Sequence, residues 1–113
     1  MTNKELESLN VKIAKKMGWT NFRKERTPEP MNTRRTTGIA PGNIRHQFVP
    51  FYTNNLAYAM QLVDWANKNG YSFRLEKEEY VSYEANFKNS DTVCTGHGTL
   101  PSMAICMAFL EIE

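Results

Sequence analysis

The stretch YSFRLEKEEYVSYEANFK, residues 71–88, decides the fold class of this chain. Apolar and polar residues alternate over residues 71–76 and again over residues 80–88, as they do in strands with one buried face. Residues 77–79 are typical of a turn between two strands, and residues 89–91 of a second turn. The alternation therefore predicts an antiparallel pair of strands.

Further strands and three helices complete the expected fold. Residues 93–97 are expected to form a third short strand, and residues 45–49 to add a fourth at an edge. Residues 3–17 and residues 53–70, the latter with Thr53 or Asn54 as a cap, carry apolar side chains at helical spacing. Residues 100–112 are apolar nearly all round, which is typical of a helix buried on both sides.

These elements predict an α/β (α+β) fold in which helices sandwich a small antiparallel sheet of three or four strands. The chain of 113 residues is expected to be a single α-β-α sandwich domain, residues 1–113, in the order helix, long loop, helix, three strands, helix. A domain of this size covers only part of an all-apolar helix. We therefore expect a homo-oligomer that assembles through the C-terminal helix.

Residues 19–52 interrupt this pattern with a predicted long, basic loop. The segment holds four of the five prolines and six Lys/Arg residues against two glutamates. Loops longer than about 12–15 residues are uncommon in compact domains and are usually functional or disordered. The loop is therefore the first place to look for a binding site.

The composition, 41% apolar and 23% charged, is typical of a soluble globular protein. No run approaches the roughly 18 apolar residues of a membrane span. The N-terminus leads into an amphipathic pattern rather than an apolar signal sequence. We expect a cytoplasmic protein whose two cysteines, Cys94 and Cys106, are reduced and lie in the core.

Charge is distributed unevenly along the chain. Residues 1–47 contain ten Lys/Arg and four Asp/Glu, a balance of +6, whereas residues 48–113 contain four and eight, a balance of −4. This asymmetry indicates an anionic partner for the first part, or subunits that meet basic face to acidic face. A net charge of only +2 and the lack of a recognition-helix motif make nucleic acid an unexpected partner.

Short motifs in the three helical regions resemble a known family: IAKKMGW (residues 13–19), VPFYT (49–53) with NGY (69–71), and AICMA (104–108). Together they are similar to the small phage proteins grouped as the phage ABA (α-β-α) sandwich domain, over most of residues 6–112 apart from the loop. The resemblance implies a bacteriophage or prophage origin, a location in the host bacterial cytoplasm, and an α/β sandwich. It brings no catalytic motif and assigns no role to any residue.

The sequence offers little support for catalysis. Its two histidines, His46 and His97, lie far apart, and no Walker loop or nucleophile motif accompanies them. Neither histidine stands at ligand spacing from a cysteine. We expect a non-enzymatic protein without a metal site or a cofactor.

The strongest candidate binding site is a cluster of arginines, threonines and a histidine in the loop: Arg34, Arg35, Thr36, Thr37, Arg45 and His46. The planar fork of arginine binds phosphate through paired hydrogen bonds. Threonine hydroxyls can provide the uncharged part of a phosphate cradle. A disordered, solvated basic loop and a surface for an acidic partner protein remain as alternatives.

A second candidate lies just before the last helix: Gly96, His97, Gly98 and Thr99. Free backbone amides and the positive end of the helix dipole favour anions there. A simple strand-to-helix turn is the alternative, because a G-x-G pattern recurs often by chance.

The leading functional hypothesis is a phage protein that binds a small phosphorylated, nucleotide-type ligand at these clusters. In the setting that the resemblance implies, it would sequester a signalling nucleotide of the bacterial immune system. The runner-up is a phage protein that inhibits or recruits a host protein through its basic loop. A minor structural or nucleic-acid-associated protein is a third alternative, and it predicts salt-sensitive binding to DNA.

Overall fold

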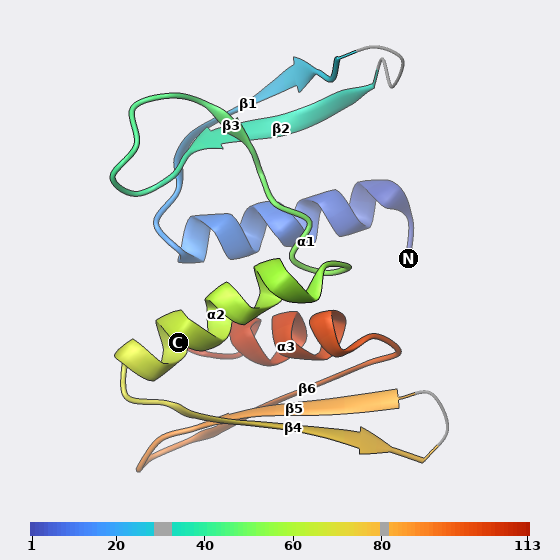
Figure 1. The fold of residues 1–113 in the computed structure, drawn as a ribbon, viewed down its shortest axis with the longest axis vertical. Coiled ribbons are helices and arrows are strands. Elements are labelled where there is room, and N and C mark those ends of the chain that lie inside the picture. Colours follow the sequence, from blue (N-terminus) through green and yellow to red (C-terminus); the bar gives the residue numbers. More distant parts are fainter. Residues whose placement is uncertain (29–32, 80–81) are drawn as a thin grey trace. The chain divides into compact units, whose positions relative to one another are not determined.

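The computed structural model describes residues 1–28, 33–79 and 82–113. They form two compact units, Met1–Pro50 (unit 1) and Phe51–Glu113 (unit 2), each with its own antiparallel sheet (Figure 1). Three helices and six strands occur in this described part of the chain, which confirms the α+β fold class. Within it, no helix is long and apolar enough to cross a membrane.

Unit 1 begins with helix α1 (Asn3–Lys16), whose start is set by a capping box. The Thr2 hydroxyl accepts a hydrogen bond from the Glu5 amide, and the Glu5 carboxylate accepts one from the Thr2 amide. This exchange satisfies donors that a helix end leaves free. The helix is capped at Met17, and Gly18 follows with a φ of 96° that suits glycine. The predicted first helix is confirmed.

Strands β1 (Thr20–Arg26), β2 (Arg34–Ile39) and β3 (Gln47–Phe48) form the sheet of unit 1, with β2 in the centre. Both strand pairs are antiparallel. The edge strand predicted at residues 45–49 is present as the shorter β3, but it belongs to the sheet of unit 1 and does not extend the sheet predicted from residues 71–97.

The long loop predicted for residues 19–52 therefore contains a complete sheet. Strand β1 is exposed along most of its length, so no apolar alternation identifies it. Asn21, with a positive φ of 56°, lies at a register shift that interrupts the period of two. Strand β2 buries threonine and glycine rather than large apolar side chains. The prolines that suggested a loop lie outside the strands, at positions 28, 41 and 50, and Pro30 lies outside the described residues.

Unit 2 contains the predicted order of elements: α2 (Leu56–Lys68), β4 (Ser72–Glu78), β5 (Ser82–Lys88), β6 (Val93–Gly98) and α3 (Pro101–Leu110). Its sheet has the order β4-β5-β6 and is antiparallel throughout, as the alternation predicted. The first two positions of the strand predicted for residues 80–88 lie outside the described residues.

The start of α2 is set by Asn55, whose side chain accepts a hydrogen bond from the Tyr58 amide at 3.3 Å. The cap predicted at Thr53 or Asn54 is therefore wrong. Thr53 is instead buried, and its carbonyl accepts a 2.8 Å hydrogen bond from the Ser102 hydroxyl on α3. The segment that enters α2 is thus tied to α3.

The core of unit 2 lies around α3, which has the sheet on one side and α2 on the other (Figure 1). Phe87 of β5 is fully buried, as are Ile105 and Phe109 of α3. Trp65 of α2 meets Phe109 edge to face, with ring centroids 5.3 Å apart. This layering within one unit accounts for the all-round apolar character of α3. The homo-oligomer expected from that character stays a prediction.

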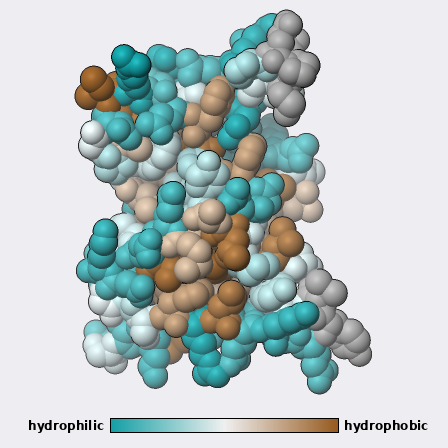
Figure 2. Space-filling view, in the orientation of Figure 1, coloured by the Kyte–Doolittle hydropathy of each residue, from teal (hydrophilic) through white to brown (hydrophobic). Residues whose placement is uncertain are grey.

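The face of this sheet that turns away from α3 is polar. In register, Asn86 stands opposite Thr95, and the Thr95 hydroxyl donates to the Asn86 side chain at 2.7 Å. Arg74 pairs with Glu76 on the same face of β4. Figure 2 shows the contrast: hydrophilic residues follow the sheet of unit 2, and hydrophobic residues gather over α2 and α3.

Candidate functional site

The residues predicted to bind a ligand fall into two groups, one in each unit. The first lies in unit 1, on β2 and in the loop before β3: Arg34, Arg35, Thr36, Thr37, Arg45 and His46. The second lies in unit 2, at the end of β6: Gly96, His97, Gly98 and Thr99. The prediction that both groups hold one ligand stays a prediction.

Two of the β2 residues are engaged in contacts that hold unit 1 together. The Arg35 guanidinium donates to the Val49 carbonyl at 2.8 Å and lies over the Phe48 ring, 4.9 Å from its centroid. The buried Thr37 hydroxyl donates to the Arg23 carbonyl at 3.4 Å. These contacts join β1, β2 and the segment after β3.

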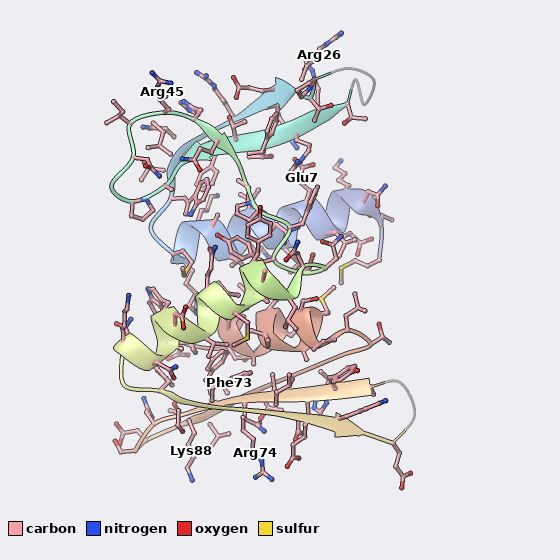
Figure 3. The ribbon with its side chains drawn as sticks, viewed as in Figure 1. Glu7, Arg26, Arg45, Phe73, Arg74 and Lys88 are labelled. Carbon is pink, nitrogen blue, oxygen red and sulfur yellow. The ribbon has the colours of Figure 1, made fainter. Side chains whose placement is uncertain are left out.

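The remaining arginines of the first group are exposed. Arg34 stands directly opposite Arg26 in the register of β1 and β2, which places like charges side by side. Figure 3 shows Arg26 and Arg45 projecting outward from unit 1. His46 contacts the Asn21 carbonyl through Nε2 at 2.8 Å. Arg34 and Arg45 are therefore accessible to an anion or to an acidic protein surface.

A basic groove of about 320 Å³ lies beside α1 and the β1–β2 pair, wholly within unit 1. Its lining consists of four lysines and four other residues: Lys4, Lys12, Lys15, Lys24, Glu7, Ser8, Val11 and Thr36. We call it the lysine groove. Thr36 is the one residue that it shares with the binding site predicted from the sequence.

Glu7, a carboxylate that lines the lysine groove, ties α1 to the sheet (Figure 3). Its Oε1 accepts hydrogen bonds from the Thr36 amide and hydroxyl, both at 2.8 Å, and lies 2.7 Å from Lys24 Nζ. Burial raises the pKa of Glu7, but the hydrogen bonds from Lys24 and Thr36 outweigh burial and lower the pKa below its ordinary value of 4.5. The ionised carboxylate offsets the charge of Lys24, so the other three lysines set the potential of the groove.

Helical spacing brings those three lysines to one side of α1. Lys4, Ser8, Lys12 and Lys15 follow one another at intervals of four, four and three residues, which places them on one face. Lys15 Nζ also lies 5.7 Å from the centroid of the Phe22 ring, a cation–π contact that limits its motion. Lys12 and Lys15, three residues apart, repel each other, and a bound anion would relieve this repulsion.

Sequence reasoning missed the lysines of α1 as site residues, because an amphipathic helix ordinarily turns its lysines to water. Two signals could have indicated them. One is the common face of Lys4, Lys12 and Lys15, and the other is the excess of positive charge in residues 1–47. Neither signal shows that a sheet lies beside this face, because β1 and β2 were not predicted.

The glycines of the second group allow α3 to approach β6 closely. A Cβ on Gly96 would lie 2.2 Å from the Ala108 amide nitrogen, and one on Gly98 would lie 2.8 Å from the Met103 side chain. Packing therefore explains both glycines without a ligand. Thr99 is exposed beyond the strand, and the anion site expected at this turn stays a prediction.

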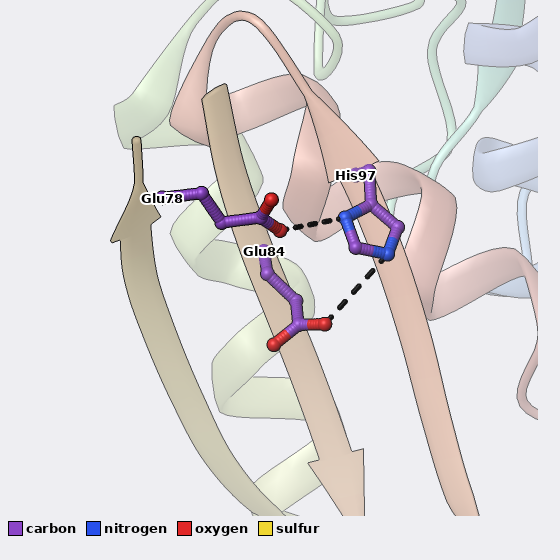
Figure 4. Close-up of side chains that lie close together, drawn as sticks. All are labelled: Glu78, Glu84 and His97. Atoms are coloured by element: carbon purple, nitrogen blue, oxygen red, sulfur yellow. Dashed lines mark hydrogen bonds and ion pairs between the residues drawn. The ribbon is translucent and has the colours of Figure 1, made fainter. Parts of the chain in front are cut away.

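His97 lies between two carboxylates on the polar face of the unit 2 sheet (Figure 4). Its Nδ1 is 2.9 Å from Glu78 Oε1, and its Nε2 is 3.7 Å from Glu84 Oε1. The three residues come from β4, β5 and β6, and Glu84 stands directly opposite His97 in register. Sequence spacing did not reveal this cluster, because its members become neighbours only through strand pairing.

The fold is similar to that of a phage protein from Bacillus cereus, known from a crystal structure. The two chains superpose with a TM-score of 0.67 and are 22% identical, over 98% of this chain and 95% of the other. At this level of identity, the similarity shows a shared fold. No model of a known protein family matches the chain, and no curated protein matches it. Membership of the ABA sandwich family stays a prediction.

Proposed function

We propose that this protein binds a small phosphorylated ligand of the nucleotide type in the lysine groove of unit 1. The observation that carries the proposal is that Lys4, Lys12 and Lys15 line one groove, and that the only carboxylate among its described residues is already paired with Lys24. Ammonium groups bind phosphate oxygens as point charges. The groove therefore carries a net positive charge, which attracts an anion.

The size of the groove suits a small ligand. Its volume of about 320 Å³ lies at the lower end of the range of roughly 300–1,000 Å³ typical of small-molecule sites. A mononucleotide or a sugar phosphate is of the right order. The Ser8 side chain lines the same groove and can donate a hydrogen bond to a phosphate or sugar oxygen.

The chemistry of the lining favours binding without conversion of the ligand. Apart from Val11, the lining side chains are ammonium groups, hydroxyls and one carboxylate. That carboxylate, on Glu7, has its Oε1 engaged by Thr36 and Lys24 and so is poorly placed to act as a base. A protein of this kind removes its ligand from solution by holding it.

The proposed biological setting is a bacteriophage or prophage. The similarity of fold to a Bacillus cereus phage protein supports this origin. In the host cytoplasm, a phage protein that holds a nucleotide without converting it can sequester a signal of the bacterial immune system. We propose this anti-defence role for the chain.

Isothermal titration calorimetry tests the binding site. The panel comprises cyclic dinucleotides, cyclic ADP-ribose, AMP and pyrophosphate, and we expect at least one nucleotide-type ligand to bind with a dissociation constant of about micromolar or below. The double variant Lys4→Gln/Lys12→Gln should weaken this binding at least about tenfold, because each lost ammonium group removes an attraction of about 1 kcal/mol.

The matched control is Lys68→Gln/Lys88→Gln, which removes the same charge from exposed positions of unit 2. The affinity of this control variant for the ligand should equal that of the unaltered protein. The proposal fails if no ligand of the panel binds, or if the two double variants lose affinity equally, since that result would indicate attraction by net charge alone.

A second candidate function is the inhibition or recruitment of a host protein through the basic segment at residues 19–52. The exposure of Arg34 and Arg45 favours it, because exposed guanidinium groups can pair with the carboxylates of an acidic protein surface. On this alternative, Arg34→Gln should abolish capture of a defined host protein, whereas the lysine double variant should retain it.

A further inference from the structure

The polar face of the unit 2 sheet brings together one metal-binding type of side chain from each of its three strands. Glu78 lies on β4, Glu84 on β5 and His97 on β6, and one donor atom from each lies within 4.8 Å of the other two (Figure 4). Imidazole and carboxylate are the donors that Zn²⁺ takes in mixed sites. Glu78 and His97 are exposed, so an ion in solution can reach the cluster.

From this geometry we infer a binding site for a divalent transition-metal ion of the Zn²⁺ type, with His97 Nε2 and Glu84 as its protein ligands. Their separation of 3.7 Å is too long for a hydrogen bond. It does suit two ligands of one ion, because Zn²⁺ stands about 2.0–2.2 Å from nitrogen and oxygen ligands. Water completes the coordination.

Glu78 supports the site by orienting the imidazole. Its carboxylate lies 2.9 Å from His97 Nδ1, a hydrogen-bond distance. In the neutral tautomer that carries its proton on Nδ1, the form that a metal ion binds, the imidazole donates to Glu78 and turns the lone pair of Nε2 toward Glu84. Two acceptors then face each other, and a cation between them replaces repulsion by attraction. Metal-bound histidines commonly donate their second nitrogen to a carboxylate in this way.

The backbone holds these side chains on rigid elements. Glu84 and His97 are directly paired in register. On the same face of the sheet, two positions further along, Asn86 and Thr95 are paired and joined by a 2.7 Å hydrogen bond between their side chains. β6 is also pressed against α3, where Gly96 leaves no room for a Cβ. Sites on strands keep their geometry better than sites on loops.

The donor set predicts which ions bind. Imidazole with carboxylate favours Zn²⁺, Ni²⁺ and Cu²⁺, whereas Mg²⁺ prefers oxygen ligands and retains its water. The site lies in unit 2 and involves none of the residues of the lysine groove. Its test is therefore independent of the phosphorylated ligand.

Titration of the whole chain with zinc chloride, followed by calorimetry, tests the inference. We expect one Zn²⁺ per chain and at least tenfold weaker binding in both His97→Asn and Glu84→Gln. Glu78→Ala should weaken binding by about 10-fold or more through loss of the orienting contact. Magnesium chloride should produce no binding heat at the same concentrations.

His46→Asn is the matched control, because His46 is the other histidine of the chain and lies in unit 1. It should bind Zn²⁺ as the unaltered protein does. Amide NMR spectra verify that each variant is folded, and they should show Zn²⁺-dependent shifts on β4, β5 and β6. The inference is overturned if the unaltered protein binds no Zn²⁺ up to millimolar concentrations, or if His46→Asn and His97→Asn lose binding equally.

Discussion

Glu7 shows at the scale of one residue how the fold of unit 1 and its candidate site depend on each other. Its carboxylate joins α1 to β2 through Thr36 and to β1 through Lys24. In the same contacts, the negative charge of Glu7 and the positive charge of Lys24 offset each other. A change at Glu7 is therefore expected to alter both the stability of unit 1 and the potential of the lysine groove.

The variant Glu7→Gln should be less stable than the unaltered protein by about 1–2 kcal/mol at neutral pH, since it loses charge-assisted hydrogen bonds. Folding lowers the pKa of Glu7, so its contribution is fully present above the ordinary value of 4.5 and is lost as the pH falls through the lower folded value. Urea unfolding at about pH 7 and about pH 3 measures this.

The difference between the two proteins should shrink at the lower pH, because the stability that the Glu7 carboxylate contributes decreases as the pH falls below 4.5. The exposed Glu79→Gln is the control and should differ little from the unaltered protein at either pH. A stability difference for Glu7→Gln that is as large at pH 3 as at pH 7 would contradict the assigned role.

The predicted ligand-binding residues show what residue types reveal and what they leave open. Arg34 and Arg45 are exposed, as a binding residue must be, whereas Thr36 and Thr37 are buried in contacts within unit 1. An arginine or a threonine has the same hydrogen-bonding groups whether its partner is a phosphate or a neighbouring strand. Only the fold determines which partner satisfies it.

At the scale of elements, α1, α2 and β5 were predictable because each buries one regular face, and α3 because its apolar run continues around the whole helix. β5, for example, buries Ala85 and Phe87 two positions apart. β1 has no such signal, since its sheet exposes most of the strand to solvent. The lysine groove could not be predicted for the same reason, because it requires α1 to lie beside β1 and β2.

The close contact between β6 and α3 predicts different losses of stability when Gly96 and Gly98 are each replaced by alanine. Gly96→Ala should destabilise the protein by about 3 kcal/mol or more, because its Cβ would lie 2.2 Å from the backbone nitrogen of Ala108. Gly98→Ala should cost less, about 2 kcal/mol, because its Cβ would lie 2.8 Å from the Met103 Cβ and 3.0 Å from the Ala104 backbone nitrogen. Urea denaturation of both variants measures the two effects. Equal stabilities would show that α3 does not approach β6 as closely as described.

At the scale of the whole molecule, the division into units coincides with the division of charge. No ionisable residue lies at positions 48–50, so the balance of +6 belongs to unit 1 and that of −4 to unit 2. The sequence revealed this asymmetry without revealing the boundary. An anion should therefore bind unit 1 more strongly than unit 2.

Tripolyphosphate, titrated into the protein and followed by amide NMR, should shift resonances of unit 1 far more than those of unit 2. Residues that line the lysine groove should shift most, and the effect should weaken as salt rises, because salt screens exposed charges over about 8–10 Å. Phosphate-induced shifts of equal size in unit 2 would show that the lysines of α1 do not form a distinct site.

Because α3 is buried between α2 and the sheet, a cysteine on this helix can report how often unit 2 opens. Cys106 is fully buried on this helix, and burial raises the pKa of its thiol to about 12. A thiol-specific reagent needs an accessible thiolate, so Cys106 should react only while α3 is transiently separated from its neighbours. The rate at which the reagent modifies Cys106 then measures how often unit 2 opens, without the need to introduce a cysteine.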